Sequence, residues 1–213
     1  MPPQRTKKTK TTKKPFGSFK SFSSFPPDSE GFIPPHGGYH SLLSYQKALI
    51  VFQATEYFCN RFIDEKSRTY DQMIQAARSG KQNILEGSVE SGTSKEGELK
   101  LTNVARASQE ELLEDYLDFM RSRKIEEWKL TDRYAKRLRQ LNRIRDATYE
   151  TFKKGIEHAD PAICANVIVG LIKVTSYLLD EQLRRLERDF LANGGLREAM
   201  TRARLAARSR QQS

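Results

Sequence analysis

The sequence predicts an all-α chain in which four long helices pack into a bundle, with an additional helical arm, a disordered basic N-terminal tail and a short basic C-terminal helix. Apolar residues recur at helical spacing through most of the 213 residues. Capping residues and glycines separate these stretches, and no stretch alternates apolar and polar residues as a strand does. The predicted divisions are a tail over 1–35, a bundle over 36–193 with its extra helix at about 132–158, and a basic suffix over 194–213.

The charge is concentrated at the two ends. Residues 1–40 carry a balance of +5, residues 196–213 carry +4, and the middle, 41–195, carries +1 of the total of +10. Basic tails on a nearly neutral body are typical of chains that seek a polyanion, although they would also keep a protein in solution. Four phenylalanines at three-residue spacing in the first tail would stack on bases, dock on the body or lie disordered, and these alternatives stay open: Phe16, Phe19, Phe22 and Phe25.

Two helices open the bundle. The first, over 41–63, has apolar residues on most of its surface and is predicted to be substantially buried. The second, over 67–88, has two distinct faces at 100° per residue. Its small apolar face is predicted to contact another helix: Tyr70, Met73, Ala77, Gly80 and Ile84. Its opposite face is a stripe of amides and hydroxyl with one carboxylate: Gln72, Gln75, Ser79, Gln82, Asn83 and Glu86.

Three further helices follow. Ser94 caps a helix over 95–123, which holds the densest acidic cluster: Glu110, Glu111, Glu114, Asp115 and Asp118. These acids are predicted to face solvent or the Arg-rich segment that begins at Thr131–Asp132, and Trp128 between them is predicted to plug one end of the core. Asp160–Pro161 is a strong start signal for the last long helix, which Gly194–Gly195 ends. The suffix can then form one short basic helix.

Two sets of residues are candidate nucleic-acid contacts. Arg78 and Lys81 flank the amide stripe, and amides with cations can bond bases or phosphates. The stripe would equally serve a subunit interface, with the acidic part of the third helix beside it. In the suffix, Arg197, Arg204 and Arg208 lie within about 60° on a helix, and Arg202 and Arg210 broaden that patch.

Catalytic and cofactor motifs are absent from the sequence. It has no glycine-rich phosphate loop, no Cys-x-x-Cys and no nucleophile elbow. The histidines suggest no metal site, so no metal, no cofactor and no enzymatic activity are predicted. A divalent-metal nuclease using Glu86 and the third-helix acids is the competing hypothesis.

Cys59 and Cys164 are predicted to be buried free thiols. No secretory segment follows Met1 and the apolar runs look too short to span a bilayer, so a cytoplasmic protein is expected.

Several motifs in order carry a resemblance to a known family. SYQKALIVFQATEYFCNRF, SRTYDQMIQAARSGKQNILEG and SKEGELKLTNVARASQEELLEDYLDFMRSRKIEEW resemble the four helix bundle family, whose members include proteins encoded within intervening sequences of 23S ribosomal RNA genes. GLIKVTSYLLDEQLRRLERDFLANGGLREAMTRARLAAR is similar to its suffix subgroup. The resemblance spans about 31–208, and the segment of about 132–158 looks like an addition. The family's core motif falls on Ala76, Ala77, Arg78, Asn83, Ile84, Glu86 and Gly87.

The resemblance implies an antiparallel up-and-down bundle that assembles into a ring, typically a homopentamer, without established enzymatic activity. The chain is also similar to the accessory proteins of diversity-generating retroelements, which work with a reverse transcriptase and nucleic acid. The expected function is therefore a non-catalytic oligomer that binds RNA or DNA non-specifically. The alternative is a protein-interaction scaffold, for example a partner of a reverse transcriptase or of a ribosomal component, that does not bind nucleic acid itself.

Overall fold

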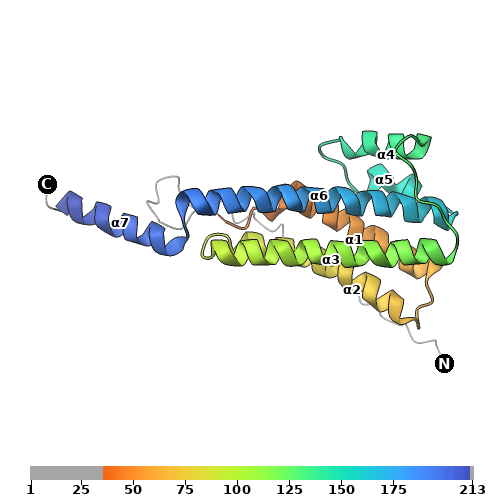
Figure 1. Ribbon diagram of the computed structural model, residues 1–213, viewed down its shortest axis with the longest axis horizontal. Coiled ribbons are helices and arrows are strands. Elements are labelled where there is room, and N and C mark those ends of the chain that lie inside the picture. The colour runs from red at the N-terminus through yellow and green to blue at the C-terminus, as the bar shows by residue number, and fades with distance from the viewer. Residues whose placement is uncertain (1–35, 212–213) are drawn as a thin grey trace, which may run out of the picture. The chain divides into compact units, whose positions relative to one another are not determined.

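The computed structural model describes residues 36–211, and this part of the chain consists of helices and their connections, without a strand (Figure 1). The all-α prediction is confirmed. The predictions for residues 1–35, including the phenylalanine-containing tail, lie outside the described residues. The elements are η1 (Tyr39–Ser41), α1 (Leu43–Phe62), α2 (Arg68–Glu90), α3 (Lys95–Ser122), α4 (Arg133–Asn142), α5 (Tyr149–Ile156), α6 (Pro161–Asn193) and α7 (Leu196–Gln211).

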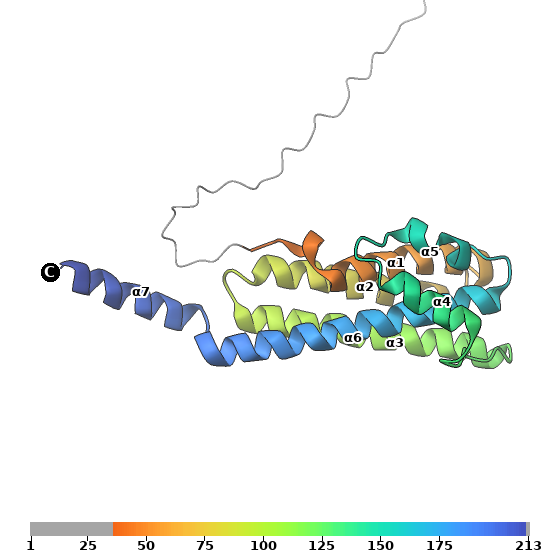
Figure 2. The same ribbon diagram turned by 90° about the horizontal axis from the view of Figure 1, so that it is seen from above.

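Four long helices pack along one another. α2 lies against α1 and α3, and α6 lies against the same two helices. Short connections at 63–67 and 91–94 reverse the chain, so that successive long helices run in opposite directions (Figures 1 and 2). The start of α1 is joined to α6 where the Ser44 hydroxyl donates to Gln182 Oε1 at 2.7 Å.

The helix ends lie where the capping residues predicted them. Ser94 accepts a hydrogen bond from Gly97 N at 2.9 Å, and the carboxylate of Asp160 accepts one from Ala162 N at 2.8 Å. Gly194 ends α6 with a φ of 70°, a conformation that favours glycine, and its N–H donates to Phe190 O at 2.8 Å. These local signals explain why the helix bounds could be predicted to within a few residues.

Most of the small apolar face of α2 is buried, as the sequence predicts, whereas its first member, Tyr70, is only half-buried. Met73, Ala77, Gly80 and Ile84 are buried, and Ala76 beside them is buried as well. A Cβ atom at Gly80 would overlap the side chain of Gln109 on α3. This residue therefore permits a close approach of the two helices.

The predicted arm at about 132–158 is two helices rather than one. α4 ends at Asn142, where the N–H of Arg143 turns back to Gln140 O at 3.2 Å. α5 begins with a capping box in which the Thr148 N–H donates to Thr151 Oγ1 at 3.1 Å. Both helices pack on α6, and α5 also contacts α1. Leu138 of α4 and Phe152 and Ile156 of α5 are buried in these contacts. The capping pattern Thr148-x-x-Thr151 marks the start of this second helix in the sequence, and the prediction of one continuous helix did not take it into account.

α5 covers a buried lysine on α1. Lys47 is 5% exposed, and its Nζ lies 4.8 Å from the centroid of the Phe152 ring. The ammonium has no hydrogen-bond partner within the described structure. Burial lowers the pKa of Lys47 because it penalises the charged form.

Both cysteines are buried free thiols, as predicted. Burial raises the pKa of Cys59 and of Cys164 to about 12. Cys164 donates to Ile156 O, so α6 is tied to the end of α5.

One expectation about apolar runs is wrong. The span Pro161–Arg210 contains an 18-residue window that is long and apolar enough to cross a bilayer, by length and composition alone, and 61% of that window is buried inside the structure. α6 contacts α1, α3, α4 and α5. A helix with neighbours on several sides is apolar on more than one face.

We predict that Gly80→Leu overpacks the contact between α2 and α3 and lowers the free energy of unfolding by about 1–3 kcal/mol. Gln53→Leu, at an exposed position of α1, adds a similar side chain without a clash and should change stability by less than about 0.5 kcal/mol. Urea denaturation of both variants followed by circular dichroism measures the difference. Equal stability of the two would show that the face assignment of α2 is wrong.

Candidate nucleic-acid and self-association surfaces

The amide stripe of α2 is divided in the structure. Ser79 and Asn83 turn toward α3: the hydroxyls of Ser79 and Ser108 share a hydrogen bond of 2.9 Å, and Asn83 Nδ2 donates to Ser79 O at 2.9 Å. These two predicted contact residues therefore belong to a polar seam inside the chain. The other four members face outward at least in part: Gln72, Gln75, Gln82 and Glu86.

Exposed apolar side chains continue the outward stripe onto α3. Val89 is 49% exposed and Val104 is 38% exposed. A shallow groove at Val89 is lined by Leu85, Glu86, Val89, Glu90, Thr93 and Leu101. We call this region the α2–α3 face: Gln72, Gln75, Gln82, Glu86, Val89 and Val104. Charged residues are depleted in the core of protein interfaces, and Glu86 is the one charged member of this face.

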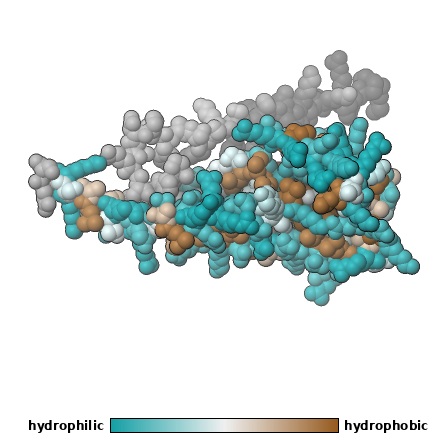
Figure 3. Space-filling view, turned by 45° about the horizontal axis from the view of Figure 1, so that its top comes forward, coloured by the Kyte–Doolittle hydropathy of each residue, from teal (hydrophilic) through white to brown (hydrophobic). Residues whose placement is uncertain are grey.

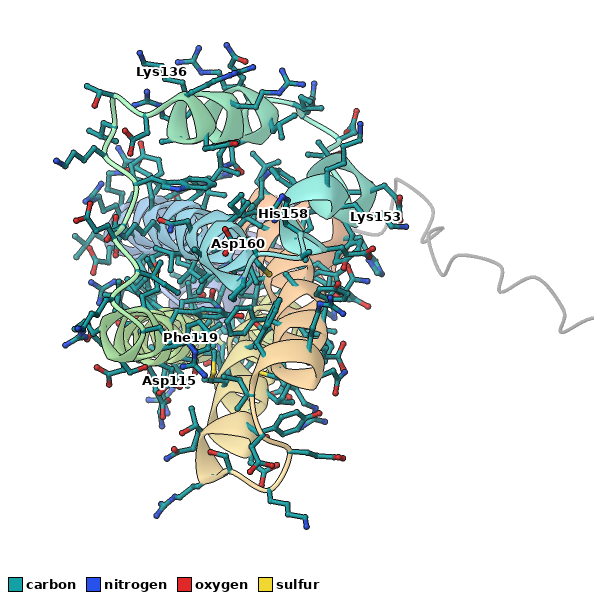
Figure 4. The ribbon with its side chains drawn as sticks, turned by 90° about the vertical axis from the view of Figure 1, so that its right-hand side faces the viewer. Asp115, Phe119, Lys136, Lys153, His158 and Asp160 are labelled. Carbon is teal, nitrogen blue, oxygen red and sulfur yellow. The ribbon has the colours of Figure 1, made fainter. Side chains whose placement is uncertain are left out.

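The acidic cluster of α3 points to solvent. Glu110, Glu111, Glu114 and Asp118 are exposed, and Arg121 of the same helix forms ion pairs with Glu114 and Asp118 at 3.0 and 3.1 Å. No ion pair joins the cluster to the segment 133–145 within residues 36–211. Figure 4 shows Asp115 and Phe119 on α3, away from α4. Of the two predicted alternatives, the solvent-facing one holds.

Asp115 differs from its neighbours because it is partly buried beside the α2–α3 contact. Its Oδ2 is buried without a hydrogen-bond partner in the described structure. Burial, and then the negative charges of Glu111 and Asp118, raise the pKa of its carboxyl above the usual value.

The two cations that flank the amide stripe have different surroundings. Arg78 is exposed, as a phosphate contact requires. Lys81 is half-buried, and its Nζ lies 4.6 Å from the centroid of the Phe52 ring on α1. Because this cation–π contact occupies the ammonium, Lys81 ties α2 to α1 rather than presenting its charge beside the stripe.

The predicted basic suffix forms α7. No side chain of residues 196–210 is buried, and all five arginines of the helix are exposed: Arg197, Arg202, Arg204, Arg208 and Arg210. Arg202 Nη2 also donates to Asn193 O at 2.8 Å and so helps to cap α6. Glu198 accepts a hydrogen bond from Gly195 N at 2.8 Å, and the backbone N–H groups together with Arg202 and Arg197 lower the pKa of Glu198. The carboxylate of Glu198, the one acid of α7, thus binds the backbone at the start of its own helix.

The structure shows a second basic surface, which only one of the two sequence-based alternatives had placed against the acids. We call it the basic arm: residues 129–145, which carry seven Lys and Arg against Asp132. Its cations on and after α4 are all exposed: Arg133, Lys136, Arg137, Arg139, Arg143 and Arg145. Figure 4 shows Lys136 on the side of α4 that faces away from α6, and Figure 3 shows a mostly hydrophilic surface over α4 and α5. The sequence shows that this segment is rich in arginine, but it does not show whether these arginines form ion pairs with the α3 acids.

No metal site is found among the described residues. Within 36–211, no group of three or more His, Cys, Asp or Glu side chains is placed to hold a metal ion. Glu86 accepts a hydrogen bond from Gln82 Nε2 at 3.3 Å, and His158 Nδ1 accepts one from Asp160 N at 3.0 Å. Comparison of the chain with protein-family models, with curated proteins and with solved structures finds no match.

We predict that Asp115→Asn raises the free energy of unfolding at pH 7 and that this gain disappears as the pH falls below about 3.8. The folded state raises the pKa of this carboxyl, so ionisation costs stability as the pH rises, whereas below the usual value both states carry the neutral acid. Glu110→Gln, at an exposed acid on the same helix, is the matched control and should change the stability at pH 7 by less than about 0.5 kcal/mol. Denaturation at several pH values measures both variants. A gain for Asp115→Asn that persists unchanged at pH 3 would contradict the assignment.

Proposed function

We propose that this chain is a non-catalytic, oligomeric helical-bundle protein that binds RNA or DNA non-specifically as an accessory factor. The observation that carries the proposal is α7, a helix that exposes all five of its arginines beyond a body whose charge nearly cancels. No cofactor or small-molecule substrate is required for this function. The two buried thiols fit a reducing compartment, and we place the protein in the cytoplasm.

The chemistry of α7 suits phosphate. The guanidinium group forms paired hydrogen bonds with phosphate oxygens. Arg197, Arg204 and Arg208 fall on one side of the helix, and all three side chains are exposed. Such a set neutralises the backbone of RNA or DNA without reading its sequence, so binding should weaken steeply with salt.

The architecture supports an assembly. We infer that the four long helices are an antiparallel up-and-down four-helix bundle with α4 and α5 as an additional arm, which is the arrangement that the resemblance implies. The resemblance also favours a homopentamer. In an oligomer each copy would add its own α7, so that weak contacts would combine through avidity.

The α2–α3 face is our candidate for the subunit contact. It combines exposed valines with amides that can bond across an interface, and the seam of Ser79, Asn83 and Ser108 beneath it holds the two helices in register. The same face supports the alternative function, a scaffold that contacts a reverse transcriptase or a ribosomal component without nucleic acid. The two functions are separated by whether the purified chain binds nucleic acid at all.

We predict that replacing Arg197, Arg204 and Arg208 by Gln weakens binding to duplex DNA and lowers the slope of log K against log salt by up to about 3, because each lost phosphate contact removes about 0.9 from the slope. The matched control replaces Arg61, Lys66 and Arg68 by Gln, which are exposed cations around the turn between α1 and α2. The control changes the net charge equally and should keep most of the slope. Isotherms at several salt concentrations, with the full chain, measure both.

Two outcomes would contradict the proposal. If the wild-type chain binds neither RNA nor DNA at low salt, the scaffold becomes the better reading. If both triple variants lose the same amount, binding follows net charge alone and α7 has no special part in it.

We predict that the wild-type chain is an oligomer at micromolar concentration and that Val104→Glu lowers its mass in light scattering, because a carboxylate on the α2–α3 face would be buried without a partner. Tyr177→Glu is the matched control, since Tyr177 is 60% exposed on α6 and lies outside that face. It should leave the mass unchanged. A monomeric wild-type chain would exclude the self-association part of the proposal.

A further inference from the structure

An exposed aromatic pair lies at the start of the basic arm. The rings of Trp128 and Tyr134 are stacked, with centroids 5.2 Å apart and planes inclined by 21°. Trp128 packs partly against the core, whereas Tyr134 is 56% exposed. Trp128 therefore supports one face of the Tyr134 ring, and much of that ring remains open to solvent.

Several contacts hold this pair in place. Asn166 of α6 is buried, and its side chain accepts a hydrogen bond from Trp128 N at 2.8 Å and donates one to Glu126 O at 3.1 Å. Arg139 Nη2 donates to Leu130 O at 2.8 Å. The segment before α4 is thus fixed from both sides, so little ordering is needed before the pair can bind a ligand.

The charge around the pair is positive. Arg133 precedes Tyr134, and Arg137 lies three residues beyond it on the neighbouring part of the helix surface. Lys129 also flanks the pair. Of the nearby acids, Glu127 is paired with Lys173 of α6, and Asp132 accepts a hydrogen bond from Lys129 N at 2.6 Å. Glu126 is the remaining acid of this segment, and it is exposed.

We propose that the basic arm binds single-stranded nucleic acid, with an unpaired base stacked on Tyr134 and the adjoining phosphates bound by Arg133 and Arg137. An exposed, supported aromatic ring among cations is the combination that single-strand binding uses, because every base has a flat face. In a duplex the bases are already stacked on one another, so Tyr134 would add nothing there. The site deepens the function proposed above and rests on it for the class of ligand, but it shares no residue with α7.

The site contains the only tryptophan of the chain, so its fluorescence reports on the site directly. In the full chain, a 12-residue oligouridylate should quench Trp128 and saturate. An abasic oligomer of the same length has the same phosphates without bases, and a DNA duplex has no unpaired base. Both should bind more weakly to the arm and quench less.

Substitutions separate stacking from charge, with affinity measured by the anisotropy of labelled oligouridylate. Tyr134→Ala should weaken binding by roughly 5- to 100-fold, while Tyr134→Phe keeps the ring and should retain the affinity within about twofold. The matched control is Tyr177→Ala, an equally exposed tyrosine on α6, which should change nothing. Circular dichroism verifies that each variant is folded.

The outcomes are distinct from those for α7. The Gln variant of Arg197, Arg204 and Arg208 should keep the quenching of Trp128 by oligouridylate even where duplex binding falls, so failure of the α7 proposal leaves this one standing. Affinity for the abasic oligomer equal to that for oligouridylate would overturn the single-strand site. So would a Tyr134→Ala variant that binds as wild type, or polyglutamate that quenches Trp128 as strongly as oligouridylate, which would indicate an acidic protein as the ligand.

Discussion

The close contact between α2 and α3 is the constraint on which the rest of the structure depends. A Cβ atom at Gly80 would overlap Gln109, and one at Gly87 would lie 3.3 Å from Leu101 Cβ, so both glycines let the helices approach. This approach joins Ser79 to Ser108 and makes one continuous outer surface from two helices. It also encloses the Gln109 amide, whose two polar atoms have no hydrogen-bond partner in the described structure. An unsatisfied buried amide costs about 1–3 kcal/mol, so the packing around it must offset that amount.

The near-neutral charge of the body conceals a strong separation within it. The +1 balance of residues 41–195 is the sum of the basic arm and an acidic remainder that includes the exposed cluster on α3. Since the two regions form no ion pair with each other within residues 36–211, each keeps its own field. Electrostatic steering depends on such local fields more than on net charge, and exposed charges further apart than about 8–10 Å are largely screened from one another at physiological salt.

Much of the fold could be predicted from local signals. The caps at Ser94 and Asp160 and the glycine at 194 act on residues close to them in sequence, and the buried face of α2 follows from helical periodicity. The division of the arm into α4 and α5 was missed because Thr148 is a weaker cap signal than Asp160–Pro161.

The candidate sites were harder to predict, because their geometry depends on contacts between distant segments. Lys81 was expected beside the amide stripe, yet the ring of Phe52 from another helix holds its ammonium. Trp128 was expected only as a plug for the core. In the structure its backbone is held by Asn166, 38 residues further along the chain, and no pattern of spacing indicates such a pairing.

The lysine beneath α5 has a consequence for how the motion of that helix can be followed. Acylating reagents attack only a neutral amine that solvent can reach, and the Lys47 amine is enclosed by Phe152. Its acylation therefore requires α5 to separate from α1, while lysines on the surface react without any opening. Mass spectrometry of a single digest measures both acylation rates. The ratio of the Lys47 rate to the rate of the surface lysines gives the fraction of time that α5 is detached from α1. Measurements of global unfolding do not reveal such a local equilibrium.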